Sequence, residues 1–247
     1  MVETVEPLDA RVKSVSNTEE VYARLREMLL DGEIPPGTVI SQVQLARQLG
    51  VSTTPLREAM RLVQAEGLLV AEHNQRSRVA PIDPMDIDAV QASRVLLESL
   101  AIRLTVPTLT ETDDAALRCD LDLMSQAARA ADVRAWDPVH KEFHRRLIQG
   151  ADRRLRRLID PLADRSERYR RYSLFGSPAR SWEIGMQEHE AIVEACLARD
   201  AERASVLLAR HYARAGLTML AKIAPEGNPA AIRTALQVVQ SSATDRR

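Results

Sequence analysis

Two histidines four residues apart, His140 and His144 in the segment HKEFH, are the side chains of this sequence best placed to do chemistry. On a helix this spacing puts both imidazoles on one face, one turn apart, which is how a helix grips a divalent metal ion. The segment also resembles the HExxH signature of zinc peptidases, in which a Glu directly after the first His is the general base. That position is Lys141 here, and Glu142 points to another face, so the pattern favours metal binding over hydrolysis.

Two further histidines, His189 and His211, lie beside apolar residues in MQEHEAIVEAC and LLARHYARAG, which predict helices. A lone His on an apolar face is most often a core residue with one hydrogen bond. Four unpaired buried imidazoles would be costly, however, and one divalent ion satisfies all of them. We therefore expect His140, His144, His189 and His211 to bind a divalent metal. Imidazole suits Zn²⁺, Ni²⁺, Cu²⁺ and Fe²⁺, of which we expect Zn²⁺ first and Ni²⁺ second. Asp137, three residues before His140, stays open as an alternative fourth ligand.

The bulk composition limits the class of protein. The chain has 247 residues, 45% of them hydrophobic and only 3% aromatic, and a formal net charge of −1. This net charge gives no indication of nucleic-acid binding, and the two cysteines form no CxxC pair. Because we find no signal peptide and no apolar run of about 18 residues, we expect a cytoplasmic protein without a membrane partner.

The elements that must position these residues fall into two parts. Residues 1–17 are polar and read as a flexible arm, and residues 18–82 predict three helices and a small hairpin. Gly50 should end the second helix, with Ser52 as N-cap of the third. A longer helical part begins at Asp83-Pro84, a cap followed by a proline that suits a first helical position.

The second part, residues 84–223, predicts only helices, and residues 224–247 read as a C-terminal tail with one weak helix. We expect a mainly α protein, with an N-terminal winged helix-turn-helix and a C-terminal all-α antiparallel helical bundle. The expected helices of the second part span 84–105, 110–131, 133–150, 152–175, 179–199 and 200–223.

A helix-turn-helix with a wing suits DNA, because its second helix fits the major groove and presents its N-terminal residues to base edges. Those residues are Ser52, Thr53 and Thr54, with Arg57 one turn further, and the wing carries His73. Residues 41–80 hold five Arg against three Glu. That surplus alone leaves open a three-helix domain that packs on protein.

The sequence from VYARLREMLL to RSRVAPI closely resembles the winged helix of the GntR family of bacterial transcription regulators over about 62 residues. PPG, LA..LGVS..PLREA and L...GL carry the resemblance. It implies that this part binds double-stranded operator DNA. Arg57 and His73 match positions that touch DNA in related regulators. The family usually has Arg after the Ser that opens the recognition helix, but Thr53 stands here, so we do not expect the usual operator.

The second part resembles the FCD domain, the helical effector-binding module of the FadR-like branch of the same family. RVLLESLAIRL, the FH pair and EHEAIVEACLARDAERASVLLARH carry this resemblance. Many such domains bind a metal through one Asp and three His. His144, His189 and His211 fall on the three His positions, and His140 stands where the Asp is expected.

Two residues are candidates for the effector pocket. Arg94 matches a position that often faces the effector in the resembled domain, although a pair with Glu98 four residues on is an equal alternative. Trp182, two turns before His189, is a candidate pocket wall, with core packing as its alternative. The Arg-rich segment 152–172 predicts a solvated helix face or a dimer surface.

Together these features predict a ligand-responsive transcription regulator and not an enzyme. We expect a homodimeric repressor that binds a palindromic operator and senses a small carboxylate effector beside the metal. A metal-dependent hydrolase and a regulator whose metal is purely structural are the alternatives.

Overall fold

The computed structural model describes residues 18–30, 32–72, 76–174 and 180–244, with side chains described outside 172–182 and 243–244. The predicted arm, residues 1–17, lies outside these ranges. The chain divides into two compact units, Met1–Pro81 and Ile82–Arg247. The fold is mainly α, as predicted, and strands occur among the described residues only in the first unit.

The first unit is a winged helix-turn-helix. Its strands form one antiparallel sheet in the order β1-β3-β2, in which Leu69 pairs with Val79. The hairpin of β2 and β3 is the wing. The elements of this unit are α1 (Thr18–Leu30), β1 (Val39–Ile40), α2 (Gln42–Leu49), α3 (Thr53–Ala65), β2 (Leu69–Ala71) and β3 (Ser77–Val79).

An apolar core holds α3 in its position and orientation within this unit. α1 packs against α3, and Leu25 and Leu56 are fully buried between the elements. Gly50 ends α2 with φ +70°, a left-handed conformation that glycine adopts without a Cβ penalty, so this prediction is confirmed. Ser52 follows as the N-cap residue of α3.

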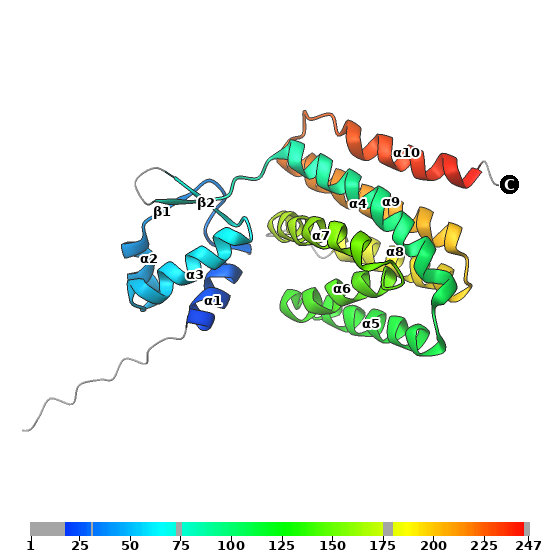
Figure 1. Ribbon diagram of the computed structural model, residues 1–247, viewed down its shortest axis with the longest axis horizontal. Coiled ribbons are helices and arrows are strands. Elements are labelled where there is room, and N and C mark those ends of the chain that lie inside the picture. Colours follow the sequence, from blue (N-terminus) through cyan, green and yellow to red (C-terminus); the bar gives the residue numbers. More distant parts are fainter. Residues whose placement is uncertain (1–17, 31, 73–75, 175–179, 245–247) are drawn as a thin grey trace, which may run out of the picture. The chain divides into compact units, whose positions relative to one another are not determined.

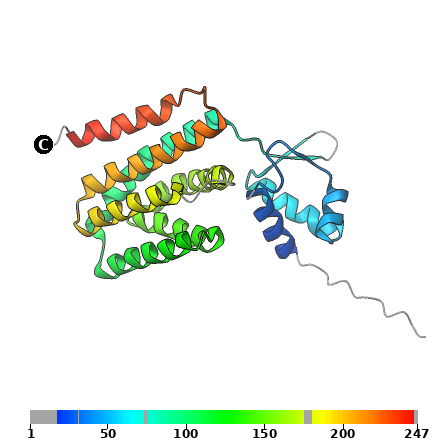
Figure 2. The ribbon, with the colours of Figure 1, turned by 180° about the vertical axis from the view of Figure 1, so that it is seen from behind.

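The second unit is an all-helical bundle. α4 packs against α7, α9 and α10, while α5 packs against α6 and α8. α5 and α10 lie at opposite edges of the unit in both ribbon views (Figures 1 and 2). The elements are α4 (Pro84–Thr105), η2 (Val106–Thr108), α5 (Glu111–Arg129), α6 (Val133–Leu147), α7 (Arg153–Leu174), α8 (Arg180–Leu197), α9 (Ala201–Ile223) and α10 (Ala230–Thr244).

Side-chain caps set where the helices of the bundle begin. The Asp83 carboxylate accepts a hydrogen bond from the Met85 backbone N–H at 2.9 Å, and Pro84 occupies the first turn of α4, as predicted. Ala80 donates its backbone N–H to Leu68 of the first unit at 2.9 Å. The first unit ends at Pro81, so Ile82 alone lies between it and the Asp83 cap of α4.

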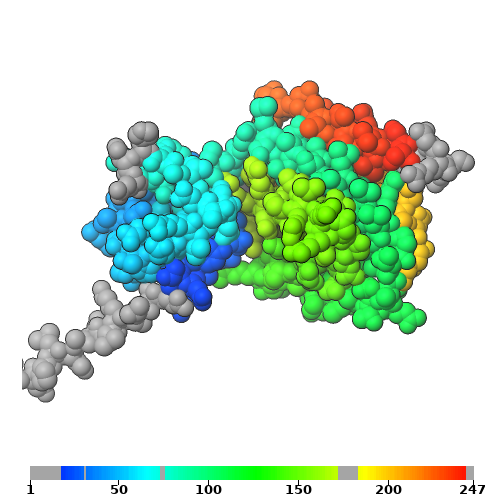
Figure 3. All heavy atoms as spheres, in the orientation of Figure 1, coloured from blue at the N-terminus to red at the C-terminus, as the bar shows by residue number. Residues whose placement is uncertain are grey.

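The expectation of a C-terminal tail at 224–247 needs correction. Residues 230–244 form α10, which packs against α4 and α9 and lies along the edge of the unit in the space-filling view (Figure 3). Ile232, Ala235 and Val239 belong to the same apolar core as the other helices. Burial of this apolar stripe stabilises a helix that looks weak by sequence alone.

One glycine marks a close approach between α4 and the end of α6. A Cβ on Gly150 would lie 2.8 Å from the Thr105 Cα, and the Gly150 backbone N–H donates to Thr105 Oγ1 at 3.1 Å. No helix in the described part of the chain combines the length and apolar composition needed to cross a membrane.

Candidate functional site

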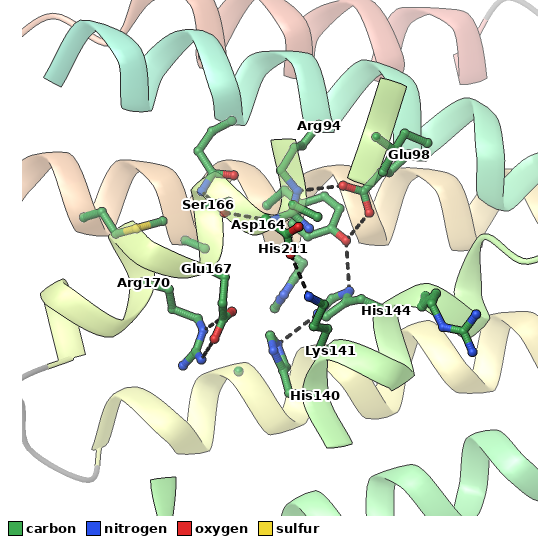
Figure 4. Close-up of a pocket in the computed structure, with 18 of the residues that line it drawn as sticks. Arg94, Glu98, His140, Lys141, His144, Asp164, Ser166, Glu167, Arg170 and His211 are labelled. Atoms are coloured by element: carbon green, nitrogen blue, oxygen red, sulfur yellow. Dashed lines mark hydrogen bonds and ion pairs between the residues drawn. The ribbon is translucent and has the colours of Figure 1, made fainter. Parts of the chain in front are cut away.

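Three helices of the bundle bring four histidines to one place. His140 and His144 come from α6, His189 from α8 and His211 from α9, and all four are buried. One ring nitrogen from each histidine can be chosen as a metal ligand, and these four nitrogens all lie within 4.8 Å of one another. Figure 4 shows His140, His144 and His211 pointing toward a common region between the helices. The structure therefore brings together the whole predicted ligand set.

The distances within this cluster suit one shared ion. The Nε2 atoms of His140 and His144 are 3.0 Å apart. Two nitrogens at about 2.1 Å from one ion would lie about 3.0 Å apart at the right angle of octahedral coordination and about 3.4 Å apart at the tetrahedral angle. The ring centroids of His189 and His211 are 4.6 Å apart, and those of His144 and His189 are 5.3 Å apart.

Unpaired ring nitrogens show that the residues fit a metal. Among the described residues, neither ring nitrogen of His189 has a hydrogen-bond partner, and neither does Nδ1 of His140. A buried polar atom without a partner costs free energy. A divalent ion would give a partner to one of the two ring nitrogens of His189, and the all-nitrogen donor set suits Zn²⁺ or Ni²⁺.

Burial keeps these imidazoles neutral, which is the form that binds a metal. It lowers the pKa of His140, His144 and His189 well below the ordinary value, and the charges of neighbouring histidines lower it further. The pKa of His211 is also lowered, mainly by burial, although Glu188 opposes the shift. No proton needs to be displaced from these rings at neutral pH before an ion binds.

Two of the four histidines have polar partners behind them. His144 Nδ1 lies 2.9 Å from the Tyr212 hydroxyl, which donates to Glu98 Oε2 at 2.5 Å. His211 Nδ1 lies 2.8 Å from Glu188 Oε2. In both residues Nε2 is left to face the cluster. Such outer partners commonly orient metal-binding histidines.

The cluster lines a cavity of about 420 Å³ within the second unit. Arg94 of α4 lines it too, and both of its expected roles are compatible with its position. Its Nε donates to Glu98 Oε1 at 2.6 Å and its Nη1 to Ser166 Oγ at 2.7 Å, while its guanidinium lies 4.0 Å from the Tyr212 ring centroid. A carboxylate in the cavity would meet this cation.

Other predicted residues lie elsewhere. Asp137 is buried and forms ion pairs with Arg170 and Arg171 and is no part of the four-residue cluster. Lys141, which replaces the general base of HExxH, pairs with Asp164 at 2.6 Å. Trp182 lies on α8, but its side chain falls outside the described part of the structure.

The predicted DNA-contacting residues gather at the start of α3. Ser52, Thr53, Thr54 and Arg57 are all exposed, and the Ser52 side chain makes no capping hydrogen bond. Its hydroxyl and those of the two threonines are thus presented at the surface of the recognition helix. His73, in the wing, lies outside the described residues.

Sequence reasoning missed several cavity residues: Gln91, Ser166, Arg170 and Tyr212. Gln91 donates through Nε2 to Ser166 Oγ at 2.8 Å, although the two residues lie on different helices. Gln91, Arg94 and Glu98 follow the i, i+3, i+7 spacing of one helix face, which was the available signal. Tyr212 carried no spacing signal beyond its position next to His211.

Comparison with known families covers both units. The family described as "Bacterial regulatory proteins, gntR family" matches residues 17–79, and the family described as "FCD domain" matches residues 89–214. The second match includes all four clustered histidines and Arg94.

Individual relatives agree. The HTH-type transcriptional regulator YdhC of Bacillus subtilis is 27% identical over 195 residues, which cover 78% of this chain and 86% of YdhC. The HTH-type transcriptional repressor GlaR of Escherichia coli is 25% identical over 197 residues, 77% of this chain and 90% of GlaR. The solved structure of E. coli McbR/YncC superposes with a TM-score of 0.68 at 25% identity, over 85% of this chain and 99% of that one.

The FCD match alone spans half of the chain, and the gntR match covers the whole winged helix. The chain therefore belongs to the GntR family, a family of bacterial transcription regulators and not of enzymes, and carries an FCD effector-binding domain.

Proposed function

We propose that this regulator is a homodimeric repressor that binds a palindromic operator and releases it when a small carboxylate binds beside a divalent metal ion. The observation that carries the proposal is the convergence of four buried histidines on a cavity that also contains Arg94. The four histidines provide ligands for the ion. The cavity provides space for an anionic ligand, and Arg94 provides a positive charge to bind it.

The ion would be held by His140, His144, His189 and His211, with Zn²⁺ the first choice and Ni²⁺ the second. Four neutral imidazoles leave its double positive charge uncompensated. In a cavity that excludes most water, that charge attracts an anion. In the FCD pattern an Asp supplies one negative charge, and His140 stands in its place, so the site in this chain should favour anions more strongly.

The carboxylate would bind between the ion and Arg94. Arg94 is buried, and its guanidinium presents a planar set of donors that suits a carboxylate. Trp182 remains a candidate wall of this pocket. The lining is otherwise partly apolar, with Ile148, Ile159 and Met219, which suits a ligand with a carboxylate and a carbon body.

DNA binding would use the start of α3. Ser52, Thr53 and Thr54 would approach base edges, Arg57 would contact a phosphate or a guanine, and His73 would contact DNA from the wing. Two copies related by a two-fold axis would match a palindromic operator. GlaR, a relative over most of this chain, is named a transcriptional repressor, which supports the sign of the regulation.

The test begins with metal content. Protein purified without chelator should contain about one Zn or Ni per chain by elemental analysis, and His144→Ala should lose it. His73→Ala is the matched control, because it removes the one histidine outside the helical unit. Absence of metal in the wild type, with no melting shift on adding Zn²⁺ or Ni²⁺, would exclude the site.

The second part of the test concerns sensing. Duplexes selected by the protein from a random pool provide the operator, and fluorescence anisotropy then measures its affinity with and without each member of a carboxylate panel. We expect at least one carboxylate to weaken binding only in the metal-loaded protein. A metal that stabilises the fold while no carboxylate changes DNA affinity would instead identify a purely structural ion.

A further inference from the structure

A chain of buried hydrogen bonds runs from α4 to the histidine cluster. Arg94 Nε donates to Glu98 Oε1 at 2.6 Å, the Tyr212 hydroxyl donates to Glu98 Oε2 at 2.5 Å, and Tyr212 Oη lies 2.9 Å from His144 Nδ1. All four side chains are buried, and Glu98 is only 1% exposed. The dashed lines in Figure 4 follow this chain from Arg94 to His144.

The direction of the bonds fixes the proton on His144. A tyrosine hydroxyl has one proton to donate, and here that proton points to the Glu98 carboxylate. The bond between Tyr212 and His144 must then be donated by His144 Nδ1–H. The lone pair of His144 is consequently on Nε2, which faces His140 across 3.0 Å.

The arrangement is particular to His144. His211 meets its own carboxylate, Glu188, directly. His189 has no hydrogen-bond partner at either ring nitrogen among the described residues, and His140 has none at Nδ1. Glu188 is in turn held by Arg214, which also lines the cavity, so the feature that sets His144 apart is the tyrosine between its ring and the carboxylate.

We propose that Glu98 and Tyr212 are positioning residues for the metal, and that Arg94 acts with them by holding the Glu98 carboxylate in the orientation that accepts from Tyr212. The inference rests on the proposed metal site. It assigns Arg94 a role in metal binding in addition to any contact with an effector. The three residues act as one unit, because each depends on the next for the direction of its hydrogen bond.

If Arg94 holds Glu98 in place for the metal site, removing Arg94 should change the metal affinity in the direction opposite to that expected from charge repulsion alone. Arg94→Met removes a positive charge near the cation site, and charge repulsion alone would then make metal binding tighter. Without its guanidinium, however, the Glu98 carboxylate would lose the donor that holds Oε1, and its other oxygen would no longer be fixed in place to accept from Tyr212. The relay therefore predicts weaker metal binding in Arg94→Met.

The experiment titrates Co²⁺ into metal-free full-length protein and follows the visible absorption of the ion, with Zn²⁺ competition to obtain the affinity. Tyr212→Phe keeps the ring and removes the hydroxyl, and should weaken binding by about 10–100-fold. Tyr169→Phe is the matched control, since the Tyr169 hydroxyl meets Asp86 outside the cavity. We expect the control to bind Co²⁺ as the wild type does.

Arg94→Met should weaken Co²⁺ binding in the wild type but add little in the Tyr212→Phe background, because residues of one relay are not additive. Metal-free melting of every variant separates a folding defect from a binding defect. Wild-type affinity in Tyr212→Phe, an equal loss in Tyr169→Phe, or tighter binding in Arg94→Met would overturn the relay while leaving the metal site in place. A wild type that binds no Co²⁺ or Zn²⁺ would overturn both.

Discussion

Mild acid should unfold the metal-free helical unit, because the histidine cluster is buried in its neutral form. Burial lowers the pKa of His140, His144 and His189 well below the ordinary value, whereas in the unfolded chain these groups titrate near 6.5. The folded state therefore binds fewer protons than the unfolded state below that pH. Stability is complete above about pH 6.5 and falls as the pH drops toward the folded-state pKa values.

The slope follows from the number of groups. Each histidine that stays neutral in the folded state and is protonated in the unfolded state removes about 1.4 kcal/mol per pH unit. Three such residues remove about 4 kcal/mol per pH unit below pH 6.5. By about pH 5 the loss reaches about 6 kcal/mol, which is most of the stability of a domain at the lower end of the ordinary range of roughly 5–15 kcal/mol.

Tryptophan fluorescence measures this transition selectively, since Trp136 and Trp182 are the only tryptophans of the chain and both belong to the helical unit. Urea unfolding at several pH values between 5.5 and 7.5, in the presence of chelator, gives the free energy of unfolding of that unit. His189→Leu should flatten the slope by about 1.4 kcal/mol per pH unit. His73→Ala should leave it unchanged.

The wild type and the variants contain the same carboxylates. The difference between their slopes of unfolding free energy against pH therefore reports the histidine alone. Equal slopes for the wild type and His189→Leu, or a metal-free wild type whose stability does not fall between pH 6.5 and 5.5, would refute the claim that these rings are buried neutral. Saturating Zn²⁺ should raise the stability at every pH, because it binds only the folded cluster.

Further changes test other parts of the structure. Thr53→Arg adds a cation at the exposed start of α3, and should steepen the dependence of log affinity on log salt by about 0.9 per added phosphate contact; anisotropy titrations at several salt concentrations measure this. His140→Asp should keep the metal and bind it at least as tightly, because a carboxylate adds charge and leaves no ring N–H without a partner; loss of metal in elemental analysis would contradict this. Burial raises the pKa of Cys196 to about 12, whereas Cys119 is exposed, so a thiol reagent at pH 8 should modify one cysteine in the native chain and two after denaturation. Gly150→Ala should lower stability by about 1–3 kcal/mol in urea unfolding, because its Cβ would press on the backbone of α4; unchanged stability would mean that this approach is looser than described.

The helices of the bundle were predictable because each carries a local signal. Asp83-Pro84 predicts the start of α4, and the structure places that cap there. The convergence of the histidines was also foreseeable, since spacing put His140 and His144 on one face and apolar neighbours put the other two inward. Whether they hold an ion remains a prediction that neither fold nor sequence tests.

Contacts between helices were not predictable, because they depend on how each helix is rotated about its axis. Nothing in the spacing of Tyr212 and Glu98 shows that their hydroxyl and carboxylate meet across α4 and α9. The Arg-rich segment illustrates the same limit. Arg153, Arg154, Arg157 and Arg165 are exposed, in line with the expected solvated face. The side chains of Arg170 and Arg171, however, are only 15% and 14% exposed and pair with buried Asp137.

The passage between the two units bears on protein engineering. The first unit ends at Pro81 and Asp83 already caps α4, so the joint between the units lies at the dipeptide Pro81–Ile82, which spans at most about 7 Å. Sensing halves of related regulators are therefore best exchanged by splicing at this dipeptide, with no residue added or removed. A flexible glycine-serine spacer would lengthen the joint by at most about 3.5 Å per residue, and in such chimaeras we expect DNA affinity to respond less to whatever the second unit binds.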